Sequence, residues 1–567
     1  MREITRLRAL GIFLLLWAVI YLPGLGSIEL KGEEARRALP AVAMLDDGHW
    51  LVPYLGGKPY LRKPPLVNWM IAGAFKLTGR RNEWVARAPS ALCMLFLGAV
   101  LIGLAGRSGW LQPSSALVAA LFSITLSGVL AKARFAGAEI DAIYTALSGI
   151  AVAVWLAWWH QGRSPWLTWT VPFVFLGVAS LAKGPSLHLL FFYAVVAGTL
   201  AAKHRMRELL HPSHWVGVLI AGAIFAAWAV PYFRSPESAQ AVAVWKAQSL
   251  GRFFDAAGAG EPREGGSTFR WASWLVNFPR ALQDLLPWLF LLPALLRVAR
   301  NGIQSSAGDA APARWIPDIK VMSFTGGCFV VLLLVPGMLP RYLLPLYVPF
   351  CIFLAAAVEG AHSDTRLLVR WHIVNRVFAG ILLVIALLMP IAAGADSRAD
   401  GIASALRAMD FAAATLAALC ATAVAGVCVL ILARKPRDLA PTALTISSCA
   451  LVAGAMLAYA FSVVPWLRRA EGTRPLAAQI DSHITEGAKL YLLDPGYLPP
   501  IFYLKSAYAY AGTWRDVPAS AGFVLVTGDG PAGGDSAGWA EIWSGRVRRG
   551  PRIRLLGQST AVNRAGL

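Results

Sequence analysis

The stretch FAAATLAALCATAVAGVCVLIL, from Phe411 to Leu432, contains no charged residue. A bilayer core about 30 Å thick needs roughly 20 apolar residues in a helix, so this stretch predicts a transmembrane helix. Similar runs recur along the chain, and we expect an all-α polytopic membrane protein with about thirteen spans. The predicted spans lie near 8–26, 86–105, 113–131, 141–159, 166–182, 186–202, 214–232, 284–299, 319–338, 341–359, 376–395, 410–433 and 441–463.

The composition supports a membrane protein. Hydrophobic residues make up 57% of the 567 residues and charged residues only 15%, where a soluble protein would carry roughly 25% charged residues. The 52 Lys and Arg outnumber the 31 Asp and Glu, but they are interspersed between the apolar runs. This pattern predicts contact with membrane lipid headgroups and a phosphorylated substrate, and no binding of nucleic acid. The six cysteines lie inside apolar segments without metal-ligand spacing, which indicates packing residues.

Basic residues in the short loops predict the orientation. No small-residue cleavage site follows the first apolar run, so we interpret this run as an anchor with the N-terminus inside. The basic loops 203–213 and 297–318 then face the cytoplasm, as the positive-inside rule requires. Loop 27–85 lies outside although it is basic, which long loops tolerate. An anionic substrate would explain its charge.

The composition changes beyond about residue 465. Short alternating runs such as 489–493 and 523–526 are separated by Gly, Pro and Asp, which predicts strands joined by turns. We expect residues 465–567 to form a small extracytoplasmic α/β domain, and residues 1–464 to form the transmembrane domain with juxtamembrane helices in loop 27–85.

Five polar clusters fall where this topology places the outer face. The first contains Glu33, Glu34, Arg36 and Arg37, which could hold a divalent ion, orient a hydroxyl group or clamp a phosphate. The alternative is a solvated amphipathic interfacial helix, since Leu39 and the residues after it continue with helical spacing. The pattern alone leaves both interpretations open.

The second cluster contains Tyr60 and Lys63, where two prolines follow the lysine and stiffen the backbone. Asp141 could carry chemistry or simply cap a helix, and Lys183 could snorkel to the interface. Residues 340–345, with Arg341 and Tyr342, could likewise belong to an interfacial belt. Each cluster has an ordinary explanation, but their convergence on one face indicates a functional site.

The order of these motifs resembles the GT-C superfamily of membrane glycosyltransferases. Within it, the sequence is most similar to the 4-amino-4-deoxy-L-arabinose lipid A transferases and their protein O-mannosyltransferase-like relatives. Those families begin the first outer loop with Asp-Glu-x-Arg-Tyr. The family's aspartate therefore falls on Glu33, which is one methylene longer, and its aromatic position falls on Arg37.

The resemblance implies single-displacement, inverting transfer of a sugar from a polyprenyl-phosphate donor, with the active site on the periplasmic side of the inner membrane. The most favoured acceptor is lipid A or lipopolysaccharide. Glu33 and Asp141 would orient and deprotonate the acceptor. The donor phosphate or substrate would be bound by Arg36, Tyr60, Lys63, Lys183, Arg341 and Tyr342. The resemblance requires no cofactor, and a divalent metal is possible but not implied.

Several alternatives remain open at this stage. The acceptor could instead be a protein hydroxyl or another envelope glycan. From other classes of protein, a lipid or glycan transporter would place charges near the midplane, and a non-catalytic scaffold would leave the clustered charges unexplained. Within the first cluster, an i,i+3 arrangement predicts that Glu33 pairs with Arg36. We expect Glu34 to pair with Arg37 and only to anchor the segment, so that Glu34→Gln would be mild.

Overall fold

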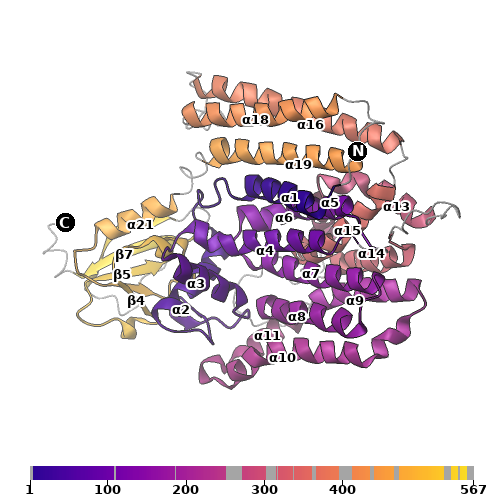
Figure 1. Cartoon of the computed structure of the whole chain (residues 1–567). Helices are drawn as coiled ribbons and strands as arrows, with labels where there is room; N and C mark the ends of the chain where they lie inside the picture. The colour runs from indigo at the N-terminus through magenta and orange to yellow at the C-terminus, as the bar shows by residue number, and fades with distance from the viewer. Residues whose placement is uncertain are drawn as a thin grey trace.

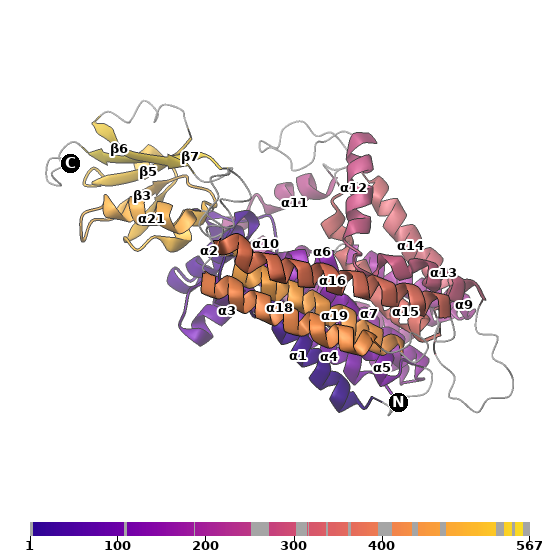
Figure 2. The same ribbon diagram turned by 90° about the horizontal axis from the view of Figure 1, so that it is seen from above.

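A computed structural model of the chain describes residues 4–106, 110–185, 187–250, 271–301, 315, 317–335, 338–360, 365–394, 411–433, 440–464, 472–528, 538–546 and 550–558. Long helices run side by side, and a small sheet domain lies at one end of the bundle beside α2 and α3 (Figures 1 and 2). The first helices are α1 Arg6–Tyr21, α2 Ala35–Asp46, α3 Leu66–Thr78, α4 Glu83–Gly103, α5 Pro113–Thr125, α6 Ser127–Leu130, α7 Ile140–His160, α8 Pro165–Lys183, α9 Leu187–Ala202 and α10 Pro212–Arg234. The others are α11 Ala241–Leu250, α12 Trp271–Gln283, α13 Leu292–Asn301, α14 Ile319–Leu334, α15 Leu344–Gly360, α16 Thr365–Gly394, α18 Phe411–Leu432, α19 Pro441–Ala458 and α21 Thr473–Ser482.

The apolar helices are long enough to cross a membrane. Within the described residues, 8 helices meet the length and composition of a span, or up to 10 if each of two bent pairs forms one span. Helices α1, α9 and α14 occupy further predicted positions but contain only 16 residues each, fewer than the roughly 17–25 of an ordinary span. The chain is therefore a multi-pass membrane protein, and the number of thirteen spans stays a prediction.

Burial separates central from peripheral helices. In α7, 94% of the apolar window is buried inside the protein, whereas in α10 and α16 the share is 22%. The two peripheral helices expose many large apolar side chains, including Leu219, Ile381 and Leu387. In water such a surface would be unfavourable, but lipid tails are as apolar as these side chains. Helix α7 therefore forms the centre of the bundle, and α10 and α16 face the lipid.

The C-terminal domain is a five-stranded mixed sheet, which confirms the predicted α/β domain. Its strand order is β4-β3-β5-β7-β6, with β3 parallel to β4 and β5 and the other pairs antiparallel. One face packs on α21 and on a short segment around Ile501, and Ala35 and Leu39 of α2 join the same apolar cluster. The boundary at residue 465 stays a prediction. The strands are β3 Leu490–Leu493, β4 Tyr508–Ala511, β5 Phe523–Thr527, β6 Trp539–Arg546 and β7 Arg552–Gln558.

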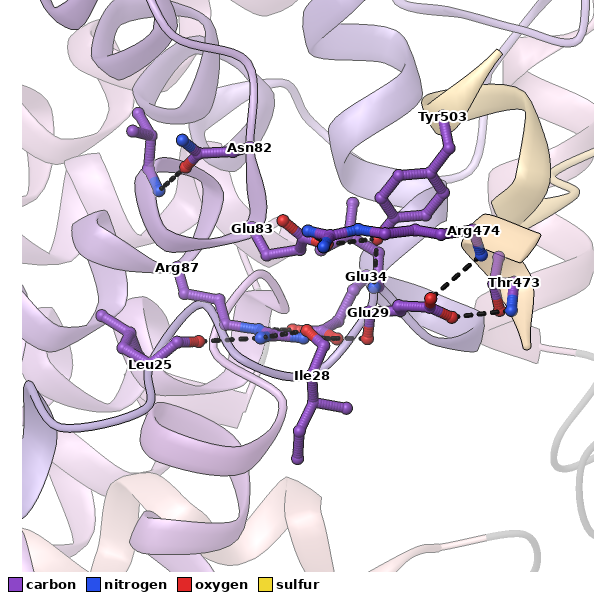
Figure 3. A network of polar contacts seen from close by, with 12 residues as sticks. Leu25, Ile28, Glu29, Glu34, Asn82, Glu83, Arg87, Thr473, Arg474 and Tyr503 are labelled. Carbon is purple, nitrogen blue, oxygen red and sulfur yellow. Dashed lines mark hydrogen bonds and ion pairs between the residues drawn. The ribbon is translucent and has the colours of Figure 1, made fainter. Parts of the chain in front are cut away.

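A polar junction joins this domain to the segment between α1 and α4 (Figure 3). The Glu29 carboxylate accepts hydrogen bonds from the backbone N–H groups of Thr473 (2.7 Å) and Arg474 (3.0 Å), the first two residues of α21. The Arg474 guanidinium lies 2.5 Å from the Glu83 carboxylate, to which the Tyr503 hydroxyl also donates at 2.8 Å. The Glu29 and Glu83 side chains are each only 2% exposed. Burial of the Tyr503 hydroxyl beside Glu83 raises the pKa of Tyr503. A carboxylate distant in sequence therefore caps α21.

Removing the Glu29 carboxylate should loosen the start of α21. Loss of a side-chain cap typically costs about 1–2 kcal/mol, so in Glu29→Ala we expect the amides of Thr473 and Arg474 to exchange faster with solvent. Hydrogen-exchange mass spectrometry of the full chain measures this. A matched control is Glu486→Ala, which removes an exposed carboxylate from the same domain. Equal protection in both variants would show that Glu29 is not the cap.

Candidate active site

The segment between α1 and α4 contains a cluster around Glu33. A short helical turn over Gly32–Glu34 leads into α2, so that Glu33 and the arginines after it lie on one side. The Glu33 carboxylate lies 2.6 Å from Arg36 and 3.3 Å from Arg37, and Arg37 also donates to the Tyr60 hydroxyl at 2.9 Å. The predicted pairing of Glu33 with Arg36 is confirmed. We call Glu33, Arg36, Arg37 and Tyr60 the loop cluster.

Glu34 has a different partner from the one we predicted. It is 1% exposed and binds Arg87 of α4 through two contacts, at 2.7 and 2.8 Å. The predicted Glu34–Arg37 pair is wrong because Arg87 binds both carboxylate oxygens of Glu34, and Arg37 instead binds Glu33 and the Tyr60 hydroxyl. The side chains of Glu33 and Glu34 diverge by about 100° on the helical turn. That divergence turns Glu34 into the protein, while Arg37 shares the side of Glu33.

The Arg87 guanidinium has a full set of partners (Figure 3). Besides Glu34, it donates to the carbonyl oxygens of Leu25 and Ile28 at 2.8 Å each and of Glu29 at 3.1 Å. Because both charged groups are buried and hydrogen-bonded, the ion pair avoids the cost of an unpaired buried charge. We overlooked Arg87 in the sequence, although an arginine inside a predicted span signals a buried partner.

A second cluster lies at the ends of the transmembrane helices. The Lys183 ammonium, at the end of α8, lies 2.6 Å from the Asp141 carboxylate in the first turn of α7. Lys183 also lies 4.5 Å from the ring centre of Tyr342 and 5.2 Å from that of Tyr144. The side chains of Lys183 and Asp141 are only 11% and 8% exposed. Lys183 therefore does not snorkel to solvent, and Glu139, not Asp141, occupies the N-cap position of α7.

Further charges surround this pair. The Glu139 carboxylate accepts a hydrogen bond from Lys132 at 2.8 Å, and burial raises the pKa of Glu139 despite that ammonium group. Lys132 and Arg341 both act electrostatically on Asp141, and the Arg341 guanidinium lies 5.7 Å from the Tyr342 ring centre. We call this group the helix-end cluster; it contains Lys132, Glu139, Asp141, Lys183, Arg341 and Tyr342. Lys132 and Glu139 were not predicted as site residues, although Glu139 lies two residues before Asp141.

A hydrogen bond joins the segments that carry the two clusters. The backbone N–H of Ala138 donates to the Glu34 carboxylate at 3.2 Å. Glu34 directly follows Glu33, and Ala138 lies three residues before Asp141. Beneath them, α2, α3, the start of α7 and the end of α8 share one apolar core. Of the predicted site residues, Lys63 is half-buried just ahead of α3, and its contact with the substrate stays a prediction.

The described residues contain no group of three or more His, Cys, Asp or Glu side chains arranged to hold a metal ion. The arrangement that they do contain is a carboxylate between two guanidinium groups, on a segment that a hydrogen bond joins to the segment of a buried lysine–aspartate pair. Carboxylates of this kind can orient a hydroxyl group and accept its proton. Fixed cations can stabilise negative charge that develops on an oxyanion or phosphate. The site is therefore suited to transfer chemistry with an anionic leaving group.

The structure predicts that only one of the two adjacent glutamates is important for thermal stability. Removing one partner of a buried ion pair typically costs about 3–5 kcal/mol, so Glu34→Gln should strongly lower the melting temperature of the purified protein. Glu33 is 19% exposed, and Glu33→Gln should leave the melting temperature nearly unchanged. This expectation replaces the mild effect predicted for Glu34→Gln. Equal melting temperatures for both variants would contradict the structural role of the Glu34–Arg87 pair.

Comparisons with known proteins show which proteins this chain resembles. Residues 62–230 match the family model for dolichyl-phosphate-mannose-protein mannosyltransferases. The chain is 26% identical to the undecaprenyl phosphate-alpha-4-amino-4-deoxy-L-arabinose arabinosyl transferase of Pseudomonas savastanoi over 62% of each chain. It is also 26% identical to that of Edwardsiella ictaluri, over 68% of this chain and 66% of the relative. These matches span less than two thirds of the relatives' length.

The structural match extends further than the sequence match. The crystal structure of ArnT from Cupriavidus metallidurans bound to undecaprenyl phosphate superposes with a TM-score of 0.67 at 19% identity and covers 98% of both chains. The apo state of the same protein gives a TM-score of 0.63 at 18% identity. The predicted fold class is thus confirmed: the chain is a multi-pass membrane protein that has the fold of ArnT and is similar in sequence to the arabinosyl transferases above.

Proposed function

We propose that the chain is a glycosyltransferase that moves a sugar from a polyprenyl-phosphate donor to lipid A at the periplasmic face of the inner membrane. The observation that carries this proposal is the helix-end cluster, where Lys183 lies 2.6 Å from Asp141 and Lys132 lies 2.8 Å from Glu139. Cations at the ends of apolar helices suit a phosphate whose lipid chain lies among those helices. The similar transferases are named for an undecaprenyl-phosphate-linked aminoarabinose donor, which favours a sugar of that type.

The reaction would proceed as a single displacement. An acceptor oxygen attacks the anomeric carbon of the donor sugar, the bond from that carbon to the phosphate oxygen breaks, and the lipid phosphate leaves with the bonding electrons. Glu33 or Asp141 accepts the proton of the acceptor. Lys183 and Arg341 stabilise the charge on the leaving phosphate, and Lys63 and Arg36 would contribute to the same task. One displacement inverts the configuration at the anomeric carbon.

A second acceptor class has one specific observation in its favour. The family model that matches residues 62–230 describes protein mannosyltransferases, so a protein hydroxyl could take the place of lipid A. Both acceptors would use the same carboxylates and the same donor phosphate site. Analysis of both products separates them: mass spectrometry of lipid A and of envelope proteins and glycans, with and without this gene. A lipid A population that does not change would reject the lipid A proposal.

Sugar transfer should depend on Lys63, Lys183 and Glu33. Removing a preorganised charge stabiliser typically lowers the rate about 10²–10³-fold, so we expect such losses for Lys63→Ala and Lys183→Ala. Glu33→Gln should remove most activity, and Glu33→Asp should retain a measurable part because it keeps the carboxylate. Turnover is measured on purified protein with a polyprenyl-phosphate sugar and lipid A.

The matched control for Lys63→Ala is Lys76→Ala. Lys76 is an exposed basic residue of the same outer loop, at the end of α3, and its loss should leave turnover unchanged. Turnover of all variants is compared at equal concentrations of purified protein. Near-normal turnover for both Lys63→Ala and Lys183→Ala would show that these lysines do not stabilise the leaving phosphate.

The periplasmic side of the site can be tested by cysteine labelling of intact cells. The side chains of Lys58 and Arg205 are 54% and 60% exposed, so cysteines at both positions can react once the reagent reaches them. With loop 27–85 outside and loop 203–213 inside, an impermeant maleimide should label Lys58→Cys and spare Arg205→Cys until the membrane is opened. The reverse pattern would overturn both the orientation and the periplasmic site.

A further inference from the structure

The C-terminal domain places one aromatic ring beside the loop cluster. Tyr497 lies in the turn that follows β3 and is 39% exposed. Among the described residues from 472 onward, it is the only large hydrophobic side chain that is exposed. A single exposed ring is common on protein surfaces. The position of Tyr497 and the way its turn is held distinguish it from such a residue.

Contacts with the first outer loop fix the turn of Tyr497. The hairpin of β1 (Tyr54–Leu55) and β2 (Lys58–Pro59) packs against the turn through Gly56, where an added Cβ would lie 2.7 Å from the Gly496 carbonyl oxygen. Only glycine permits this approach, and Gly56 also has a positive φ of 61°. The Lys58 ammonium lies 2.7 Å from the Asp494 carboxylate. The ring therefore belongs to a turn whose backbone is held against the loop that carries the site.

The ring of Tyr497 contacts the loop cluster directly. The Arg36 guanidinium lies over it, 4.0 Å from the ring centre, and the same guanidinium binds Glu33 at 2.6 Å. Tyr497 is therefore one side chain away from the carboxylate assigned to the acceptor. Arg36 covers one face of the ring, and a large part of the side chain stays open to a ligand.

We propose that Tyr497 is an acceptor-binding residue, so that the C-terminal domain supplies a subsite for a sugar ring of the glycolipid acceptor. This inference rests on the proposed function. The C–H face of a pyranose ring packs well on an aromatic ring, and binding sites combine such apolar surfaces with a few polar groups that fix orientation. Glu33 and Arg36 are those polar groups here. The acceptor suits this place better than the donor, because Glu33 lies here, whereas Lys183 and Arg341, two of the cations assigned to the donor phosphate, lie in the helix-end cluster.

Equilibrium binding of a soluble acceptor headgroup tests the inference. The probe is the deacylated lipid A disaccharide with both phosphates, titrated against the purified full-length protein in nanodiscs. We expect Tyr497→Ala to weaken binding about 3–10-fold, the effect of losing one aromatic stacking contact. Tyr497→Phe keeps the ring and should bind as the wild type does. A wild type that does not bind the probe, or a Tyr497→Ala variant that binds it equally well, would overturn the inference.

A second measurement separates binding from positioning. If Tyr497 contacts the acceptor, Tyr497→Ala should raise the acceptor KM and leave kcat nearly unchanged. If the ring only holds Arg36, kcat should fall at unchanged KM, which would overturn the inference. A wild-type protein that binds the probe but does not transfer sugar in the turnover assay would reject the proposed function. In that case, the ratio of the dissociation constants of Tyr497→Ala and the wild type would still test whether Tyr497 binds the probe.

The matched control is Tyr491→Ala. Tyr491 is a half-buried tyrosine of β3 that packs with Val524 and Trp514 in a separate apolar cluster. Its loss removes a ring from the same domain without touching Arg36, so the affinity for the probe should not change. Melting temperatures of all variants identify any that fail to fold. A parallel loss of affinity in Tyr491→Ala would show that the effect comes from the stability of the domain and would overturn the inference.

Discussion

The buried ion pair between Glu34 and Arg87 is the interaction on which the site depends. Two charges that are 1% and 2% exposed would be very costly alone in an apolar environment. Here the Arg87 guanidinium donates two hydrogen bonds to the Glu34 carboxylate and three more to backbone carbonyl oxygens. Its partners all lie in the segment between α1 and α2, Arg87 itself lies in α4, and Glu34 also accepts a hydrogen bond from the backbone ahead of α7. One ion pair thus fixes the segments that carry both clusters.

This constraint explains why two adjacent glutamates differ in role. A helical turn cannot place both side chains on one side, and burial of Glu34 leaves Glu33 on the side of Arg36 and Arg37. The hydrogen bond from Ala138 fixes the start of α7 relative to the same turn. Asp141 follows three residues later and meets Lys183 from the end of α8. The candidate site therefore forms where a single buried contact aligns a loop with two helix ends.

The sequence predicts local features of this structure well and long-range features poorly. The positions of the apolar helices and the Glu33–Arg36 pair follow from hydrophobic runs and from i,i+3 spacing. The Asp141–Lys183 pair joins two helices, and only the convergence of the motifs and the family resemblance placed these residues in one site. The Glu34–Arg87 pair and the capping of α21 by Glu29 were missed, because spacing carries no information on partners 53 and 444 residues apart. Likewise, no pattern around Tyr497 indicates that it meets Arg36.

The charges of the two clusters suggest why the site should favour an anion. In the helix-end cluster, Lys132 pairs with Glu139 and Lys183 pairs with Asp141. In the loop cluster, two guanidinium groups flank the Glu33 carboxylate. Excess charge in a partly buried site is unfavourable unless a counter-ion balances it. The paired carboxylates lower the cost of holding the cations together. In the proposed reaction, a phosphate bound to Lys183 would weaken the contact between Lys183 and Asp141, and the Asp141 carboxylate would then be a better acceptor for a proton. The same ion pair can thus serve both substrate binding and the activation of the acceptor.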